Sequence, residues 1–249
     1  MRFVGIDLGW TSGATGLCCL EWADDRLQLR DSTRSLELTD ILAWVDRWAP
    51  TGHSAIVAVD APTVIPNPTG MRLADRLVHQ HFGRYHAGAY PANQGLPFAE
   101  RTVGFSQALM ARGFQHGDVI APQVPGRYQI ELFPHAAMIG LFELSRIFKY
   151  KKGRLAERRP ELAKLQQAIK AWLPRRSPAF NLDQAELLAE PIPTKGKDLK
   201  HLEDRLDALV CAYAAAHWWY WGVERNLVLG DRDAGYIVVP TPPPLRTPS

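Results

Sequence analysis

The chain has 249 residues, of which 46% are hydrophobic and 22% are charged, enough to bury the core of one α/β domain. No run approaches the roughly eighteen apolar residues of a membrane span, and the start, MRFVGIDLGW, lacks the layout of a signal peptide. The three cysteines are an odd number set in apolar stretches, which argues against a disulfide framework or a cysteine-based zinc site. We therefore expect a soluble, cytoplasmic protein.

The small net charge of +3 is distributed unevenly along the chain. The segment from Arg146 to Lys200 has 14 Lys and Arg residues against 6 Asp and Glu, whereas the rest of the chain has a net charge of −5. A basic segment on an acidic body is a typical electrostatic footprint for nucleic acid. A solvated helical face is the alternative interpretation.

The first sixty residues predict a mixed sheet. Apolar runs and apolar–polar alternation indicate three strands of an antiparallel meander, at residues 3–8, 14–22 and 27–35. A turn is expected at Asp24-Asp25, and Thr39 is a suitable N-cap for a helix that ends at Pro50. The β-branched run 55–59 then indicates a strand covered on both faces and reached through that helix.

Residues 61–126 are rich in Pro, Gly, His and Arg, and we interpret them as a long insertion beside the sheet. Helices are expected near 71–82, 105–112, 157–173 and 201–222, and further strands near 127–133 and 236–239. Pro134 suits the first turn of another helix. The proline-rich residues 240–249 predict a disordered tail after a single domain that spans 1–239.

Acidic residues stand where apolar ones are expected. Three predicted strands contain one acid each: Asp7 in VGIDLG, Asp60 in IVAVD and Glu131 in QIELFP. A carboxylate buried in a strand costs desolvation unless a cation or several donors meet it. The last predicted helix adds Asp204 and Asp207 on one face, with Glu203 beside them. Acids crowded in this way repel one another, and a divalent cation relieves the repulsion.

Some of these acids also have an ordinary structural interpretation. Asp60 is equally typical of a loop cap at the end of a strand. Glu203 and Asp204 are typical first-turn acids stabilised by the helix dipole. Asp7 and Asp207 are harder to explain in this way, because one interrupts a buried strand and the other borders an apolar stripe. As a set, the acids favour a Mg²⁺ or Mn²⁺ site, in which two ions about 4 Å apart would promote phosphodiester cleavage.

Several short motifs together resemble the RNase H-like superfamily and, within it, the DUF429 family of predicted nucleases. They are Asp7 followed by Gly9, VDAP at Asp60, ELFPHAAM around Glu131, HLEDRLDALVCAYAA on the last helix, and GYIVVP. The resemblance spans most of residues 1–239. It implies a central five-stranded mixed sheet flanked by helices, an acidic site at the edge of the sheet, and a two-metal hydrolytic mechanism.

In the site that this resemblance implies, Asp7 bridges two metal ions and Asp60 or Glu131 binds one of them. Asp207, with Asp204 beside it, completes the ligand set from the last helix. The expected enzyme is a metal-dependent nuclease with nucleic acid as its partner.

Other side chains have two interpretations each. His135 would touch a substrate phosphate or serve as a hydrogen-bonded structural histidine. The cluster Trp218–Trp221 would stack bases, pack in the core or form a dimer contact, and a homodimer is therefore expected as one possibility. Five cations would hold a phosphate backbone or belong to solvated surface: Arg72, Arg76, Arg84, Lys151 and Lys152.

Two rival functions remain open at this stage. The segment DLGWTSGATG resembles the first phosphate loop of the actin-like kinases and ATPases, although no second phosphate loop or Gly-rich adenosine site is evident. The other rival is a non-catalytic module with the same fold that binds nucleic acid or protein.

Overall fold

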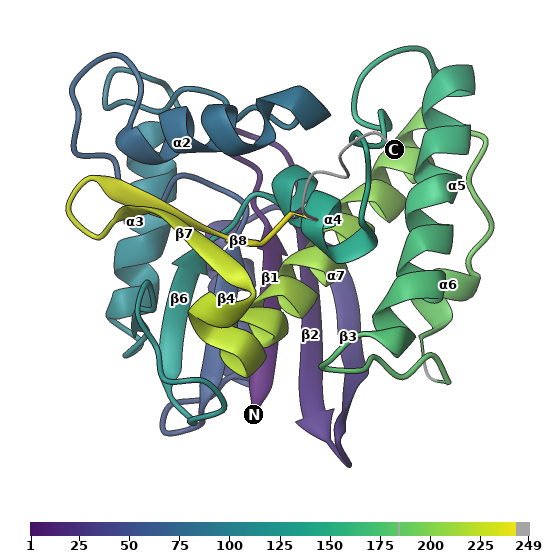
Figure 1. Ribbon diagram of the computed structural model, residues 1–249, viewed down its shortest axis with the longest axis horizontal. Coiled ribbons are helices and arrows are strands. Elements are labelled where there is room, and N and C mark those ends of the chain that lie inside the picture. The colour runs from purple at the N-terminus through teal and green to yellow at the C-terminus, as the bar shows by residue number, and fades with distance from the viewer. Residues whose placement is uncertain (184, 243–249) are drawn as a thin grey trace, which may run out of the picture.

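The computed structural model describes residues 1–183 and 185–242, and a six-stranded sheet forms its centre (Figure 1). The strands lie in the order β3-β2-β1-β4-β6-β5. Their bounds are β1 Arg2–Asp7, β2 Thr15–Ala23, β3 Arg26–Ser35, β4 Ala55–Val59, β5 Gln115–His116 and β6 Arg127–Glu131. Within the described ranges, no helix is both long and apolar enough to cross a membrane.

The pairing of the strands confirms the predicted mixed sheet. β1, β2 and β3 pair antiparallel, whereas β4 lies parallel to β1 and β6 lies parallel to β4. The turn between β2 and β3 has positive φ angles at Asp24 and Asp25, 52° and 55°, as a two-residue type I′ hairpin turn requires. A three-stranded meander followed by parallel strands is the arrangement that the sequence predicted, but the sheet has six strands where five were expected, because the two-residue β5 adds an edge.

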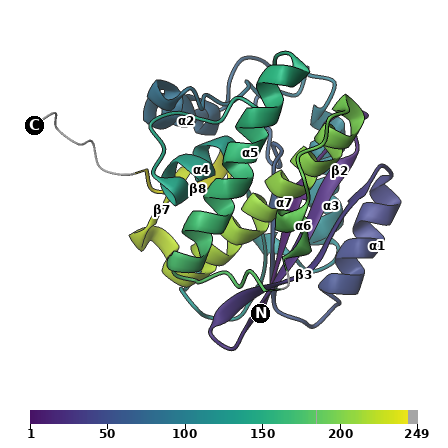
Figure 2. The same cartoon turned by 90° about the vertical axis from the view of Figure 1, so that its right-hand side faces the viewer.

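Helices cover both faces of this sheet, and α1 and α5 lie on opposite sides of it (Figure 2). The bounds are α1 Leu38–Trp48, α3 Ala99–Met110, α4 Pro134–Phe142, α5 Leu155–Trp172, α6 Glu186–Ala189 and α7 Gly196–Trp221. Because side chains alternate along a strand, Val4 and Ile6 of β1 pack with α1 and α3, while Phe3 packs with α7. The four-residue Trp cluster ends α7, and Trp218 and Trp219 are buried against the sheet, which confirms the core interpretation.

The first part of the predicted insertion builds a smaller layer with the C-terminal segment, but its second part supplies α3 and β5 to the main sheet, so 61–126 is not a single insertion. α2 (Leu73–Phe82) packs against a hairpin of β7 (Asn226–Asp231) and β8 (Gly235–Pro240), and Figure 1 shows α2 above these two strands. Short 3-10 turns lie at Gly83–Tyr85, Leu173–Arg175 and Gly222–Glu224. The predicted strand at 236–239 is confirmed as β8, but the sequence analysis missed its partner β7.

Several predicted boundaries are wrong. α1 begins at Leu38 with Glu37 as its N-cap residue, so Thr39 lies inside the helix. α3 begins at Ala99, several residues before its predicted start, and α7 begins at Gly196. Within residues 196–200, Leu199 is the one buried side chain, so the apolar stripe is too sparse there to reveal the start of the helix. Pro240 still belongs to β8, and residues 243–249 of the predicted tail lie outside the described residues.

Two glycines allow α7 to lie directly on the sheet. A Cβ atom on Gly5 of β1 would overlap the carbonyl oxygen of Ala208, and one on Gly16 of β2 would overlap that of Asp204. Any residue other than glycine would push the helix away from these strands. The close approach brings the acids of α7 beside the carboxyl end of β1.

Candidate active site

Three of the predicted acids meet at one end of the sheet. Asp7 is the last residue of β1, and Asp60 directly follows the parallel strand β4. Since Ile6 pairs with Val59 and both pack with α1, the next residue on each strand points to the opposite face, towards α7. Asp207 reaches the same place from α7. The convergence predicted for these three acids is therefore present in the geometry.

A single lysine lies between the three carboxylates. Lys151 Nζ is 2.8 Å from Asp207 Oδ2, 3.7 Å from Asp7 Oδ1 and 3.8 Å from Asp60 Oδ2. Its side chain is 28% exposed, whereas that of Asp207 is fully buried. Lys151 comes from the segment between α4 and α5, distant from all three acids along the chain. The sequence analysis assigned Lys151 to a phosphate backbone or to the surface, and no sequence signal indicates this contact.

Burial and mutual repulsion control the protonation of this cluster. Burial raises the pKa of Asp7 well above its usual value; Lys151 opposes that rise, and Asp207 and Asp60 add to it. Burial likewise raises the pKa of Asp60 to about 6, again against the effect of Lys151. Burial alone would lower the pKa of Lys151, but Asp207, Asp7 and Asp60 together raise it well above the usual value. The carboxylates thus hold a protonated lysine, and they remain short of positive charge.

Tyr150 fixes the segment that presents Lys151. The tyrosine is fully buried, its hydroxyl donates a 2.6 Å hydrogen bond to Asp207 Oδ1, and its ring stacks on His135 with centroids 5.5 Å apart. Burial, reinforced by Lys151, lowers the pKa of His135 to about 4, so this ring is neutral at pH 7. His135 therefore supports Tyr150 and lies at the wall of the site without a positive charge.

Asp204 lies beside the cluster but has cations of its own. Its two oxygens are 2.7 Å from Arg34 Nη2 of β3 and 2.6 Å from Lys200 Nζ. The neighbouring Glu203 pairs with Arg158 at 3.0 Å and with Lys200 at 2.7 Å. Lys151, Arg158 and Lys200, all from the basic segment 146–200, thus serve as counter-charges for the buried acids.

The ion pairs leave some carboxylate oxygens without hydrogen bonds. In the described part of the chain, both oxygens of Asp204 and Oδ2 of Asp207 are buried and have no hydrogen-bond partner, although a charged nitrogen lies within 2.8 Å of each. These contacts have the distance of an ion pair without the angles of a hydrogen bond. Buried carboxylate oxygens in this state are available as ligands to a cation.

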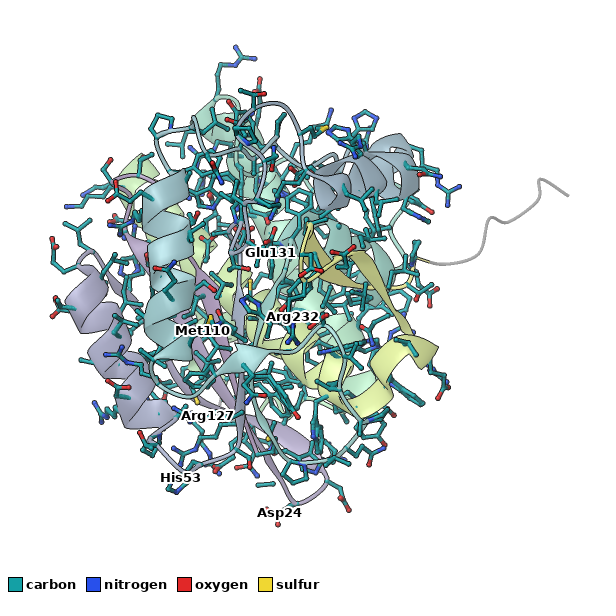
Figure 3. The ribbon with its side chains drawn as sticks, turned by 90° about the vertical axis from the view of Figure 1, so that its left-hand side faces the viewer. Asp24, His53, Met110, Arg127, Glu131 and Arg232 are labelled. Atoms are coloured by element: carbon teal, nitrogen blue, oxygen red, sulfur yellow. The ribbon has the colours of Figure 1, made fainter. Side chains whose placement is uncertain are left out.

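Glu131 lines the same cavity as Asp7 and Asp60, and its charge helps to raise the pKa of Asp60, but its own oxygens are held by other partners. It pairs with Val59, whose side chain packs on the face of α1 and α3. Both carboxylate oxygens accept hydrogen bonds from Arg72, at 2.6 Å and 2.9 Å, and Oε2 also accepts one from the Thr63 amide at 2.8 Å. Figure 3 shows Glu131 in the interior, at the end of the sheet away from Asp24 and His53. Arg72, predicted to hold phosphate or to lie in solvent, is in fact buried as the partner of this carboxylate.

A cavity of about 780 Å³ opens beside the acids. Its walls include acidic and basic side chains, among them Asp7, Asp60, Asp204, Lys151, Lys152 and Lys200. Asp207 lies behind Lys151 and does not reach the cavity surface. The volume is in the range of sites that enclose a small ligand or a single nucleotide.

The loop after β1 does not offer its first amide to a ligand. The Gly9 amide donates to the Thr15 hydroxyl at 3.1 Å, and the Gly9 carbonyl accepts from Arg101 Nε at 2.8 Å. In a phosphate loop, backbone amides point at the bound phosphate. This amide is already used within the protein.

Comparisons with known proteins identify the family. No curated protein matches the chain. A solved structure of T. thermophilus RuvC in complex with Holliday junction substrate is 13% identical, with 87% of this chain and 97% of that chain covered and a TM-score of 0.32. Residues 5–231 match the model of the DUF429 family, which is described as "protein of unknown function". Since this match spans most of its length, the chain belongs to the DUF429 family.

Proposed function

We propose that this protein is a metal-dependent nuclease that hydrolyses phosphodiester bonds of nucleic acid. The observation that supports the proposal is the convergence of Asp7, Asp60 and Asp207, from three separate elements, on one cation position beside the cavity. Mg²⁺ or Mn²⁺ bound at that position would supply an activated water and stabilise the leaving oxygen.

The donor set fits a hard divalent cation. Carboxylate oxygens are the ligands that Mg²⁺ and Mn²⁺ prefer, and Asp207 Oδ2 lacks a hydrogen bond. Within residues 1–183 and 185–242, no three His, Cys, Asp or Glu side chains are already spaced as a finished metal site. We therefore propose that Asp7, Asp60 and Asp207 bind the metal after Lys151 withdraws, with Asp204 as the nearest additional ligand. Glu131 is left out of this set because Arg72 and Thr63 already satisfy both of its oxygens.

The other residues of the site would orient these ligands and the substrate. The Tyr150 hydroxyl fixes the orientation of the Asp207 carboxylate through Oδ1 and leaves Oδ2 facing Lys151. Lys152 and Lys200 line the cavity, and Lys152 makes no ion pair among the described residues, so it is available to a phosphate oxygen.

A cleavage assay on single-stranded, duplex and branched DNA and RNA tests the proposal. We expect cleavage by the purified chain in Mg²⁺ or Mn²⁺ and none after chelation with EDTA. Calorimetric titration with Mn²⁺ gives the metal affinity independently of cleavage. Metal binding without cleavage of any of these substrates would favour the non-catalytic module, and ATP turnover would favour the kinase.

Lys151→Met should strengthen metal binding, because the neutral side chain no longer competes for the carboxylates. We expect the dissociation constant for Mn²⁺ to fall by about tenfold or more, which corresponds to about 1.4 kcal/mol. Calorimetry of the parent and the variant measures this change. Lys152→Met is the matched control, since Lys152 borders the same cavity without touching the acids. Equal or weaker Mn²⁺ binding by Lys151→Met would mean that the lysine does not occupy the position of the metal.

A further inference from the structure

Aromatic side chains border the cavity beside the acids. Trp10 and Tyr90 both line it, and the Trp10 Nε1 group donates a 2.8 Å hydrogen bond to the backbone carbonyl of Asp60. Trp10 is therefore fixed next to the acidic cluster. Tyr90 is 64% exposed. Of the large hydrophobic side chains that are exposed in the described part of the chain, it is the only aromatic one. An aromatic ring left open to solvent at a cavity is an unsatisfied stacking surface.

The Tyr90 ring is held in place before any ligand binds. Its centroid is 6.5 Å from that of Trp10 and 6.4 Å from that of Phe98, and both contacts are edge-on, at 71° and 67°. Trp10 and Phe98 in turn pack together at 4.6 Å. Two neighbouring rings thus brace Tyr90 while most of its surface remains free. A preorganised ring loses little conformational entropy when a ligand stacks on it.

The loop that presents Tyr90 is tied down on both sides. Before Tyr90, His79 Nε2 of α2 forms a 2.8 Å hydrogen bond with the Ala89 carbonyl. After it, the Ala92 amide donates to Asp75 Oδ2 at 3.0 Å. Gly88 permits this packing, because a Cβ atom there would overlap the His79 ring. The position of Tyr90 is therefore set by α2.

A buried ionic chain connects this loop to the sheet. Arg72 Nη2 bonds both Glu131 Oε1 of β6, at 2.6 Å, and Asp75 Oδ1 of α2, at 2.7 Å. All three side chains are at most 3% exposed. These contacts form a continuous link from the end of β6 to the loop, through Glu131, Arg72, Asp75 and Ala92. This link fixes the distance between the acids and the aromatic ring, and it gives Glu131 a positioning role.

We propose that Tyr90, braced by Trp10 and Phe98, stacks on an unpaired base of the bound nucleic acid, beside the phosphate at the acids. The placement of that phosphate rests on the proposed nuclease function. In a duplex, neighbouring bases cover each base face, whereas a single strand or a locally unpaired nucleotide offers a face to an aromatic ring. The cavity of about 780 Å³ accommodates one such nucleotide. The favoured substrate is therefore single-stranded or contains an unpaired position, with little preference for base identity.

Binding measurements on a cleavage-deficient chain test this inference. Tyr90→Ala and Tyr90→Phe are each combined with Asp7→Asn and assayed in EDTA by fluorescence anisotropy. The probes are a labelled single-stranded oligothymidine and an oligomer of abasic deoxyribose phosphates of equal length, which has the same charge but no bases. We expect Tyr90→Ala to weaken binding of oligothymidine about tenfold and to leave binding of the base-free oligomer unchanged. Tyr90→Phe, which keeps the ring, should bind both probes as tightly as the chain that carries Asp7→Asn alone.

Two results would overturn the inference. One is oligothymidine binding by Tyr90→Ala that equals the parent's. The other is an equal loss on both probes, because that loss would come from a disturbed loop and not from stacking. The nuclease proposal fails separately, when the parent chain cuts nothing in Mg²⁺ or Mn²⁺, since anisotropy in EDTA depends on neither metal nor cleavage.

Discussion

Asp7→Asn is expected to lower metal-dependent cleavage by more than about 100-fold, beyond the usual effect of residues that only support metal ligands. Asp7 is the acid at the end of the central strand, and its carboxylate faces the position that Lys151 Nζ now holds. An amide keeps the shape of the side chain but removes the negative charge that would bind the cation. Cleavage rates in Mg²⁺ and Mn²⁺, measured beside calorimetric Mn²⁺ affinity, report both consequences.

The same substitution should leave the fold intact. Burial raises the pKa of Asp7 in the folded chain, so the folded state favours the neutral form. The ionised form therefore costs stability once the pH rises from the unfolded pKa through the folded one, and the neutral amide avoids that cost at pH 7. We expect a Tm equal to or above that of the parent. Asp233→Asn, on the exposed turn between β7 and β8, is the matched control and should change neither property. Cleavage by Asp7→Asn at the parent rate would refute the site assignment.

Glu131→Ala should destabilise the metal-free chain by about 3–5 kcal/mol. The substitution removes both hydrogen bonds from Arg72 and the one from the Thr63 amide, and it leaves a buried guanidinium with Asp75 as its only carboxylate partner. Because Arg72 is 2% exposed, its guanidinium depends on protein partners for its hydrogen bonds. Urea unfolding followed by circular dichroism measures the free energy of unfolding.

Glu224→Ala provides the comparison, since Glu224 is 68% exposed and its pair with Arg225 is loose, at 3.7 Å. A surface pair of this kind contributes at most about 1 kcal/mol. If Glu131→Ala cost no more than Glu224→Ala, Glu131 would not anchor Arg72. A normal free energy of unfolding combined with a loss of Mn²⁺ affinity would instead make Glu131 a metal ligand, as the sequence analysis allowed.

The sheet could be predicted from the sequence because its signals are local. The meander follows from apolar runs and a two-residue turn, and the buried strand β4 follows from five consecutive apolar residues. The placement of Asp7 and Asp60 at the ends of adjacent parallel strands follows from the same pattern. Once the register between β4 and β6 is known, Glu131 lies opposite Val59, one position before Asp60, although both acids line the same cavity. The sequence places Glu131 near the other acids, but it does not reveal that Arg72 and Thr63 hold the Glu131 oxygens.

The counter-charges that come from distant segments could not be predicted from the sequence, unlike Lys200, which lies at helical spacing from Glu203 and Asp204. Lys151 reaches Asp207, and Arg72 reaches Glu131, across large separations in the chain, whereas the pair of Arg72 with Asp75 is local. Whether a carboxylate is neutralised by a lysine, an arginine or a metal depends on which loop is packed above it. The charge pattern indicated only that the segment 146–200 is basic, and that excess is compatible with either an internal or an external partner.

The absence of a side chain at Gly5 and Gly16 determines the distance between α7 and the sheet. A single methyl group at Gly5 or Gly16 would lift the helix by more than the roughly 0.5 Å of tolerance that a catalytic arrangement allows. Asp207 would then move away from Asp7 even though every acid and every lysine remained in the chain. Two hydrogen atoms in place of side chains are therefore as necessary to the spacing of the carboxylates as the carboxylates themselves.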